Sequence, residues 1–363
     1  MKSIKRICAV IIGFVFIGAG LVKLMDPVGA GLVVREYCNF MHLGFLVPAS
    51  NFLGVFMALL ESFLGAALIS GVFPVATAIA SGVVIAFFTV LTFIMWRLNP
   101  AMDCGCFGEA VHLTHLQSFL KNVGLCVLWV LAFIPFSAIR KPRKIKYVSF
   151  GIAALSIILF TVWSLISIPA IDFTPFAPGA TLMQADDSGD PDSPLLSICD
   201  AEGEYCDELL ASGDILLMTV YDVEAAPEAM LEHAVDFCRV ATEAGLLPVV
   251  VSAGELIDAA GLDAAGLDSS AGFDAAGSLS GGPQCYTSDR RTLMTVNRSN
   301  GGTTLLRDGV VVAKWPYRSM PTAERLQELQ ALDSTEALVK ENTPKRLKLQ
   351  GFLLYVFAIL LLM

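Results

Sequence analysis

Five apolar runs, each long enough to cross a bilayer, constrain this chain more than any other feature. A helix needs roughly 20 predominantly apolar residues to cross a hydrocarbon core. Runs of that kind occupy residues 7–25, 52–72, 75–96, 116–138 and 147–168. A shorter run closes the chain at residues 349–363, and we expect it to form a sixth span. The sequence therefore predicts a multi-pass helical membrane protein in contact with membrane lipid.

Composition supports this class and excludes another. Hydrophobic residues make up 55% of the 363 residues, more than in an average soluble domain. The formal net charge of −10 excludes nucleic acid as a partner, because phosphate binding needs clustered Lys and Arg. The first run lacks a small-residue cleavage site and further apolar runs follow it, so we interpret it as a retained span.

Lysine and arginine near the ends of the runs predict the orientation. Two basic clusters flank the first four runs and are therefore on one side, the cytoplasmic side: Lys2, Lys5 and Arg6, then Arg140, Lys141, Arg143, Lys144 and Lys146. The loop over residues 103–108 and the acidic segment after the fifth run then face outward. Lys345, Arg346 and Lys348 oppose this assignment mildly, but long domains cross largely regardless of charge.

These signals divide the chain into consecutive parts. We expect a four-helix membrane domain over 1–140, a basic cytoplasmic loop with a fifth span over 141–171, a soluble domain over 172–342 and a C-terminal span over 343–363. The soluble domain starts with a Pro-, Gly- and Asp-rich linker. It also contains an insertion over 254–283, built on a repeated Asp-Ala-Ala-Gly-Leu pattern without bulky core residues.

The soluble domain has an α/β pattern. "DILLMTV" at 214–220 and "LPVVVSAG" at 247–254 are typical of buried strands, and the segment 227–245 between them has helical periodicity. "TTLLRDGVVVAKW" at 303–315 predicts a hairpin that turns at Asp308-Gly309, and a helix follows at 322–332. This order of elements is that of a thioredoxin-like fold.

The hexapeptide "DCGCFG" at 103–108 holds the strongest candidate site, the cysteines Cys104 and Cys106. Disulfides persist outside the cytoplasm, and Gly105 provides the freedom to bend that a bridge between them needs. Such a small ring is strained, which favours a redox-active pair. Two alternatives are small residues packed in a tight loop, and zinc held with His112 and His115. Because that ligand spacing is uncommon, we predict no metal.

Two residues near the membrane unit are further candidates. Cys38 lies between the first two runs, where it either exchanges with the Cys104–Cys106 pair or is simply buried. Glu61 lies within the second run, and an ionisable group at that depth is a functional candidate. It either pairs with Lys23, relays a proton, or makes a structural hydrogen bond.

The soluble domain departs from an active thioredoxin. Residues 221–230, where the first helix of that fold starts, contain no cysteine, and Gly301-Gly302 occupy the place of the usual cis-proline. Cys199 and Cys206 flank a predicted hairpin and are candidates for a disulfide, although Cys285 offers alternative pairings. We expect Cys238 in the core. The domain is therefore predicted to bind or scaffold a partner.

Three features together resemble a known family: "FIGAGLVKLMDP" at 16–27, "DCGCFG", and Asn122 in the fourth run. They are similar to the DoxX-like / MauE family of four-helix bacterial membrane proteins, here fused to a degenerate thioredoxin-like domain as in a group common in Bacteroidetes. The resemblance implies a bacterial inner-membrane location with the soluble domain in the periplasm. It also implies disulfide formation during methylamine-utilisation enzyme maturation, or electron transfer from thiols to quinone, as in vitamin K epoxide reductase-like oxidoreductases.

Two functions remain at this point. The first is a thiol–disulfide relay in which Cys104, Cys106, Cys38 and Glu61 pass electrons between a periplasmic thiol protein and quinone. The second is a non-enzymatic, membrane-anchored scaffold or binding protein in which the cysteine pair is structural. Solute transport has little support, because the sequence shows no inverted repeat of broken helices.

Overall fold

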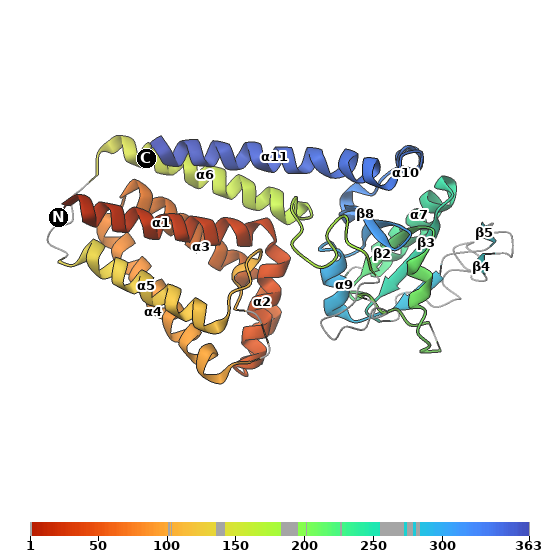
Figure 1. The fold of residues 1–363 in the computed structure, drawn as a ribbon, viewed down its shortest axis with the longest axis horizontal. Helices are drawn as coiled ribbons and strands as arrows, with labels where there is room; N and C mark the ends of the chain where they lie inside the picture. Colours follow the sequence, from red (N-terminus) through yellow and green to blue (C-terminus); the bar gives the residue numbers. More distant parts are fainter. Residues whose placement is uncertain are drawn as a thin grey trace. The chain divides into compact units, whose positions relative to one another are not determined.

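The computed structural model divides the chain into two compact units (Figure 1). The helical unit comprises Met1–Leu165 with Leu349–Met363, and the sheet unit comprises Ile166–Lys348. The structure describes residues 2–100, 102, 104–135, 142–182, 195–200, 202–225, 227–254, 272–273, 279–280 and 284–362. Asp103, parts of the basic loop and of the linker, and most of the predicted insertion lie outside these residues.

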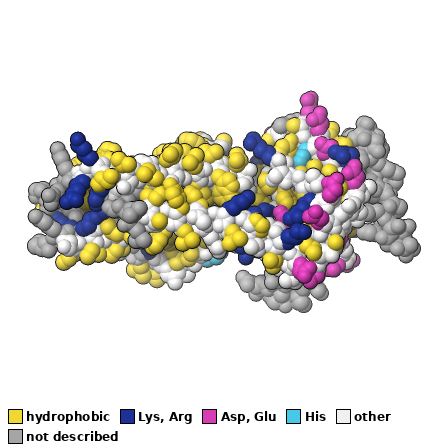
Figure 2. Space-filling view, turned by 90° about the horizontal axis from the view of Figure 1, so that it is seen from above, with side chains coloured by type: hydrophobic (Ala, Val, Ile, Leu, Met, Phe, Trp, Pro, Cys, Tyr) yellow, Lys and Arg dark blue, Asp and Glu magenta, His cyan; other side chains and the backbone are white. Residues whose placement is uncertain are grey.

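Five helices of the described chain are long and apolar enough to cross a membrane, which confirms the five predicted runs. They are α1 (Lys2–Met25), α3 (Ser50–Ser70), α4 (Pro74–Leu98), α5 (His115–Phe133) and α6 (Lys144–Ile166). Hydrophobic side chains cover this unit, whereas acidic side chains gather on the sheet unit (Figure 2). The chain is thus a multi-pass membrane protein. The run at 349–363 lies in α11 (Ser334–Leu362), and its crossing the membrane stays a prediction.

Helices α1 and α3 pack side by side at very short range (Figure 1). A Cβ atom added to Gly65 would lie 2.6 Å from the Ile17 nitrogen and 2.7 Å from the Gly13 oxygen. Small residues allow such close packing, which drives helix association where lipid removes the hydrophobic effect. The contact fixes the positions of Lys23 on α1 and Glu61 on α3.

A helix that the sequence reasoning missed follows α1. The first span ends at Met25 as predicted, and Pro27 starts α2 (Pro27–Phe40), with Asp26 as the N-cap that accepts a hydrogen bond from the Gly29 nitrogen at 2.9 Å. Proline suits the first turn because its missing N–H has no partner there. A short 3-10 helix, η1 (Gly44–Ala49), joins α2 to α3. The helical unit therefore has more than four packed elements.

The sheet unit contains a five-stranded mixed sheet in the order β6-β3-β2-β7-β8. The strands β2, β3 and β6 are parallel, and β7 and β8 are antiparallel to their neighbours. Their bounds are β2 Asp214–Val220, β3 Leu247–Ser252, β6 Gln284–Thr287, β7 Gly302–Arg307 and β8 Val310–Trp315. The helices of this unit are α7 (Pro227–Ala244), α9 (Arg290–Val296) and α10 (Ala323–Gln330), with the short η3 (Asp207–Ala211) and η4 (Tyr317–Ser319).

The predicted elements of this unit are confirmed. Strand β2 covers the predicted residues, α7 follows it, and β3 pairs with it in parallel from Ile215↔Leu247 onward. Asp308 and Gly309 have φ values of +48° and +72°, as a tight hairpin turn requires. The sequence did not predict β6, which follows the insertion and takes the edge beside β3.

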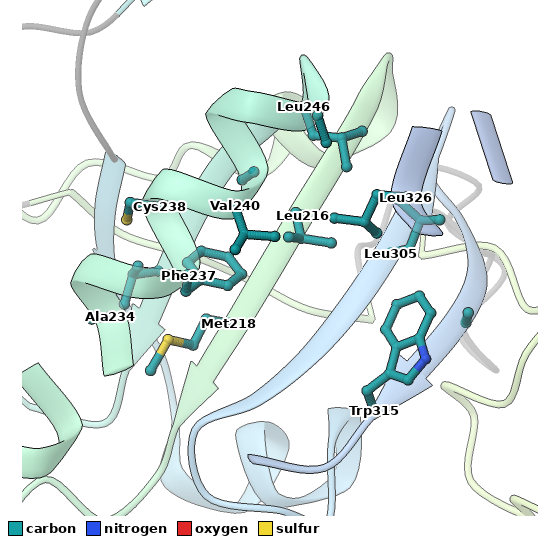
Figure 3. Packing of buried hydrophobic residues seen from close by; sticks show 14 of the residues in the cluster. Leu216, Met218, Ala234, Phe237, Cys238, Val240, Leu246, Leu305, Trp315 and Leu326 are labelled. Atoms are coloured by element: carbon teal, nitrogen blue, oxygen red, sulfur yellow. The ribbon is translucent and has the colours of Figure 1, made fainter. Parts of the chain in front are cut away.

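The core of the sheet unit lies on both faces of the sheet. On one face, Phe237 from α7 is fully buried against Leu216 and Met218 of β2, and Trp315 of β8 lies in the same cluster (Figure 3). Cys238 is also part of this cluster, as expected. Of the predicted insertion, β4 (Gly272–Phe273) and β5 (Leu279–Ser280) form a small antiparallel pair.

Candidate thiol site

The two cysteines of the hexapeptide lie together in a bent loop between α4 and α5. Their sulfur atoms are 3.6 Å apart, and both are free thiols. Gly105 between them has a φ of +56°, and the Gly108 nitrogen donates to the Gly105 oxygen at 3.1 Å, which closes a turn. Cys106 then starts β1 (Cys106–Glu109), which contacts α1 and α2. The bend that the sequence predicted is present.

Helix α2 determines the shape of this loop. A Cβ atom on Gly105 would lie 2.3 Å from Cγ1 of Val33, closer than any real contact allows. Glycine is needed at this position for two reasons, the positive φ and the lack of space. The unpredicted helix α2 thus forms one wall of the site.

Tyr37 of α2 holds Cys104 from the same side. Its hydroxyl donates to the Cys104 carbonyl oxygen at 2.8 Å and lies 3.7 Å from the Cys104 sulfur. Burial raises the pKa of the Tyr37 hydroxyl, with a smaller contribution from Cys104, so this phenol stays protonated as a donor. Cys104 itself is only 4% exposed, whereas Cys106 is partly accessible.

The two thiols differ in acidity. The hydrogen bond from Cys104 lowers the pKa of Cys106 to about 5, and the positive charges of Lys121 and Lys23 act in the same direction against burial. The same hydrogen bond, followed by burial, raises the pKa of Cys104 above its ordinary value. At neutral pH the pair therefore contains one thiolate, Cys106, and one thiol, Cys104.

Lys23 and Glu61 form a buried ion pair inside the bundle. The Lys23 Nζ atom lies 2.8 Å from both carboxylate oxygens of Glu61, and the two side chains are 11% and 7% exposed. The predicted partner of Glu61 is thus the observed one. Lys23 also lies 5.6 Å from the centre of the Phe88 ring. The pair brings a carboxylate and an ammonium group within electrostatic range of the Cys106 sulfur.

Helix α5 contributes further polar groups. The Lys121 Nζ atom lies 4.8 Å from the centre of the Phe107 ring. Phe107 directly follows Cys106 in the chain. The neighbouring Asn122 is buried and donates to the Thr92 hydroxyl at 3.1 Å and to the Phe88 carbonyl at 3.2 Å. Sequence reasoning singled out Asn122 but missed Lys121, because a lysine near the end of a span is usually solvated.

An aromatic cluster lies at the same end of α4 and α5. The rings of Trp96 and Phe119 stack with centroids 5.5 Å apart at 9°, and Phe93 lies 5.5 Å from Phe119 and 6.0 Å from Trp96. Phe93 and Trp96 are 44% and 38% exposed. Flat apolar rings are therefore exposed where α4 ends and α5 begins.

The other described cysteines of the helical unit form no hydrogen bond with Cys104 or Cys106. Cys38 follows Tyr37 on α2 and is buried, and within the described residues its sulfur makes no hydrogen bond to Cys104 or Cys106. Its predicted exchange with the pair stays a prediction. Cys126 contacts the Thr89 hydroxyl at 3.4 Å, and Cys8 packs in the apolar core.

The alternative zinc site receives no structural support. The His115 ring nitrogen Nε2 lies 3.1 Å from the Pro100 carbonyl oxygen. In the part of the chain that the structure describes, no group of three or more His, Cys, Asp or Glu side chains converges on one point.

The sheet unit contains thiols of another kind. Burial raises the pKa of Cys238 to about 12, with a smaller effect of Cys285, and burial raises that of Cys285 to about 11. Cys199 forms an isolated antiparallel β-bridge with Tyr205. The Cys206 sulfur lies 3.8 Å from an Asp200 carboxylate oxygen. The disulfide between Cys199 and Cys206 therefore stays a prediction.

The loop after β2 is held by the side chain of Asn300. Asn300 Oδ1 accepts hydrogen bonds from the Tyr221 and Asp222 nitrogens at 2.9 and 3.0 Å. Gly301 occupies the place expected for a cis-proline, with φ +72°, and donates to the Thr219 oxygen at 2.9 Å. Among the described residues, these loops contain no thiol.

The apolar helices and the loop between α4 and α5 define a class, that of multi-pass helical membrane proteins with a cysteine pair just outside their spans. Residues 1–135 match the family model of the methylamine utilisation protein MauE, and this part of the chain is similar to that family. The match ends within the loop after α5, so the sheet unit lies outside it. No curated protein matches the chain, and no solved structure does either.

Proposed function

We propose that the protein is an inner-membrane thiol–disulfide relay that passes electrons from periplasmic thiols to a quinone. The observation that carries this proposal is the Cys104–Cys106 pair, whose sulfurs lie 3.6 Å apart and differ in acidity. A structural cysteine pair needs neither a depressed pKa nor two nearby lysines. A pair that repeatedly opens and closes benefits from both.

The first half of the cycle reduces the pair. Two substrate thiols lose two electrons and two protons and become joined by a disulfide, and the Cys104–Cys106 bond takes up the two electrons and breaks. Cys106 carries the negative charge, stabilised by Lys121 and Lys23, while Cys104 takes one of the two protons beside Tyr37 and the other passes to the surrounding water. The low pKa of Cys106 makes it the better leaving group when the S–S bond opens.

The second half returns the pair to the disulfide form. A bound quinone supplies the acceptor for two electrons and two protons. The stacked rings of Phe93, Trp96 and Phe119 fit a flat apolar ring at the end of the bundle that holds the cysteines. The protein's own side chains keep Cys106 ionised and hold the Cys104 sulfur close enough for the Cys104–Cys106 disulfide to form again.

Glu61 and Lys23 are the groups through which protons reach this end of the bundle. The ion pair lies between the spans α1 and α3, and Lys23 is close enough to Cys106 to lower its pKa. Charged groups at that depth are retained for a role in ion or proton transfer in many membrane proteins. We assign the pair the task of balancing the charge of Cys106 as it gains and loses its proton.

The sheet unit positions the partner protein. Its strand order and its βαβ, hairpin and helix sequence support a thioredoxin-like fold, and the loop after β2 contains no cysteine between residues 221 and 225. We therefore assign it docking of a periplasmic thiol protein. The MauE family name points to an enzyme of methylamine utilisation as the kind of partner whose disulfides are formed.

The redox state of Cys104 and Cys106 in intact cells tests the relay. Cells are quenched with acid, free thiols are alkylated with a mass tag, and the full-length protein is compared with and without a block of quinone turnover. We expect the pair to shift toward the reduced form under the block. Cys126→Ser is the matched control, because it removes a thiol from α5 without touching the pair.

A pair that stays in one state under both conditions overturns the relay and leaves a membrane-anchored binding protein. Cys104→Ser and Cys106→Ser test whether both sulfurs are needed. Either variant should abolish oxidation of the substrate thiols, because a single sulfur cannot form the Cys104–Cys106 disulfide that accepts their electrons.

A further inference from the structure

A buried serine, Ser118, lies beside the thiol site and has no role in the steps of the proposed relay. It lies in the first turn of α5, and none of its surface is exposed. Among the described residues, its Oγ atom has no hydrogen-bond partner of normal geometry. A buried hydroxyl in that state has lost its bonds to water without replacing them, which destabilises the fold. Such a group needs an explanation, and a redox or catalytic role is one.

Two other buried serines of the helical unit bond within their own helix. The Ser62 hydroxyl donates to the Ala58 carbonyl, four residues earlier, at 2.8 Å, and Ser70 bonds in the same way at the same distance. Ser118 has such an acceptor too, because the Thr114 carbonyl lies four residues before it and accepts from the Ser118 nitrogen at 3.0 Å. In the described chain the Ser118 hydroxyl makes no bond to it. This hydroxyl is therefore available to a group outside its own helix.

The face of α5 that carries Ser118 lies against the cysteine loop. Lys121, three residues further along α5, places its Nζ atom 4.8 Å from the Phe107 ring of that loop. Residues three apart share one face of a helix, so Ser118 lies on the same side. The hydrogen bond with Cys106 and burial raise the pKa of Cys104, whereas the Ser118 hydroxyl lowers it as a hydrogen-bond donor. The hydroxyl is thus within reach of the Cys104 sulfur.

We propose that Ser118 is a catalytic residue of the relay, which donates a hydrogen bond to the Cys104 sulfur while that sulfur carries a negative charge. The inference rests on the proposed relay. When the pair is oxidised, Cys104 loses its proton, its sulfur bonds to Cys106, and the pair gives up two electrons. The two electrons, that proton and one proton from water go to the quinone. Cys104 is 4% exposed, so little water reaches its thiolate and a buried hydroxyl takes the place of water.

The dithiol form explains why the hydroxyl has no partner at rest. A neutral thiol is a weak acceptor, whereas hydrogen bonds to an ionised group are roughly twice as strong as those between neutral groups. The bond from Ser118 to Cys104 therefore forms as the charge develops on the sulfur. A donor that binds the charged state more strongly than the resting state speeds the step that creates the charge.

A chemical disulfide in place of the quinone isolates this step. The full-length protein in mild detergent is reduced, freed of reductant and mixed with dipyridyl disulfide. The Cys106 thiolate attacks the reagent and displaces one pyridinethiolate. Cys104 then loses its proton to the buffer, its sulfur attacks the mixed disulfide on Cys106, and the second pyridinethiolate leaves. Acid quenching and mass spectrometry of the peptide with both cysteines measure the two phases.

Ser118→Ala should slow the second phase roughly tenfold at pH 7, since a hydrogen bond to a charged group is worth about that factor. The first phase should not change. Ser118→Thr keeps the hydroxyl and should restore the second phase. The unfolding temperature of Ser118→Ala should not fall, because the dithiol form loses no hydrogen bond. Ser156→Ala removes a 2.8 Å bond to the Ile152 carbonyl within α6 and is the matched control, which should alter neither phase.

Two results would overturn the proposal. One is a second phase as fast in Ser118→Ala as in the unmodified protein. The other is an equal slowing of both phases with a lower unfolding temperature, which would give Ser118 a structural role. Alanine fits the space of serine, so Ser118→Ala decides the question even if Ser118→Thr does not fold. Failure of the relay alone differs: the quinone block leaves the pair unchanged in cells, while Ser118→Ala still slows closure, which supports the donor and overturns only the acceptor.

Discussion

The helical unit and the sheet unit each bury cysteines and each bury a lysine–carboxylate pair, but they combine them differently. In the helical unit, Lys23 of the Lys23–Glu61 pair acts on Cys106 and helps to lower its pKa. In the sheet unit, the Lys314–Asp172 pair has no effect on Cys238 or Cys285, whose pKa values rise through burial.

The difference shows what makes a buried thiol reactive. Cys285 is close enough to affect the pKa of Cys238, so the presence of a second sulfur is not sufficient. Cys106 has in addition a direct hydrogen bond from Cys104 and two cations. Burial penalises an isolated thiolate, whereas a hydrogen bond to the thiolate and nearby positive charges favour it. The next four predictions test this contrast.

Removal of Lys23 should have the largest effect. Lys23→Met leaves the Glu61 carboxylate buried without its partner, which should cost about 3–5 kcal/mol of stability. Lys23→Met/Glu61→Met should recover most of that loss. Thermal unfolding of the full-length protein in detergent measures both. Lys314→Met should lower stability similarly but leave alkylation of Cys106 unchanged, and a change there would break the contrast between the units.

Alkylation as a function of pH should separate the two kinds of thiol. With a pKa of about 5, Cys106 is already ionised at pH 7, so its rate should stay flat up to pH 9 and fall only as the pH drops through 5. With a pKa of about 11, Cys285 gains tenfold in thiolate for each pH unit, a rise of about 100-fold from pH 7 to 9. Peptide mass spectrometry over a time course measures both rates, and equal slopes would contradict the assignment.

Gly105→Ala should destabilise the site loop more than Gly108→Ala. Both glycines have positive φ, +56° and +57°, so both alanine variants carry a similar backbone cost of about 1–2 kcal/mol. Only Gly105 has a close neighbour, so its variant should lose roughly 1–3 kcal/mol more through overpacking. Addition of Val33→Ala should recover that excess. Unfolding temperatures of the three variants decide the question.

Tyr37→Phe should have the smallest effect, about 1 kcal/mol, because one hydrogen bond to the Cys104 carbonyl is lost. The same change removes a group that favours the Cys104 thiolate, so the pKa of Cys104 should rise further and reoxidation of the pair should slow severalfold. Tyr221→Phe, which removes a 3.1 Å hydrogen bond to the Arg298 carbonyl, is the matched control in the sheet unit. It should leave the reoxidation rate unchanged.

Much of the fold follows from sequence patterns because apolar run length and strand periodicity are local properties. The five spans, β2, α7, β3 and the hairpin at Asp308-Gly309 all have such local signals. Helix α2 was missed because its 14 residues are too few for a span, although Asp26 and Pro27 cap its start. Strand β6 has only four residues and follows a low-complexity segment, so it offers no periodicity to detect.

The candidate site was predictable only in part for a similar reason. The pair Cys104–Cys106 was a candidate from the sequence, and the contact with Lys23 was one of three alternatives for Glu61, since cysteines one residue apart and an acid within a span are locally unusual. Tyr37 and Lys121 were not expected, because their roles depend on the packing of α2 and α5 around the loop. Tertiary contacts of that kind leave no pattern within a single segment.

The contact between Gly105 and Val33 has a consequence for how related sequences can vary. The two positions share one small space, so they should change together across homologues. A residue that tolerates positive φ, such as Asn, can replace Gly105 only where position 33 holds Ala or Gly. A valine at position 33 together with any side chain at position 105 should therefore be rare among relatives that keep both cysteines.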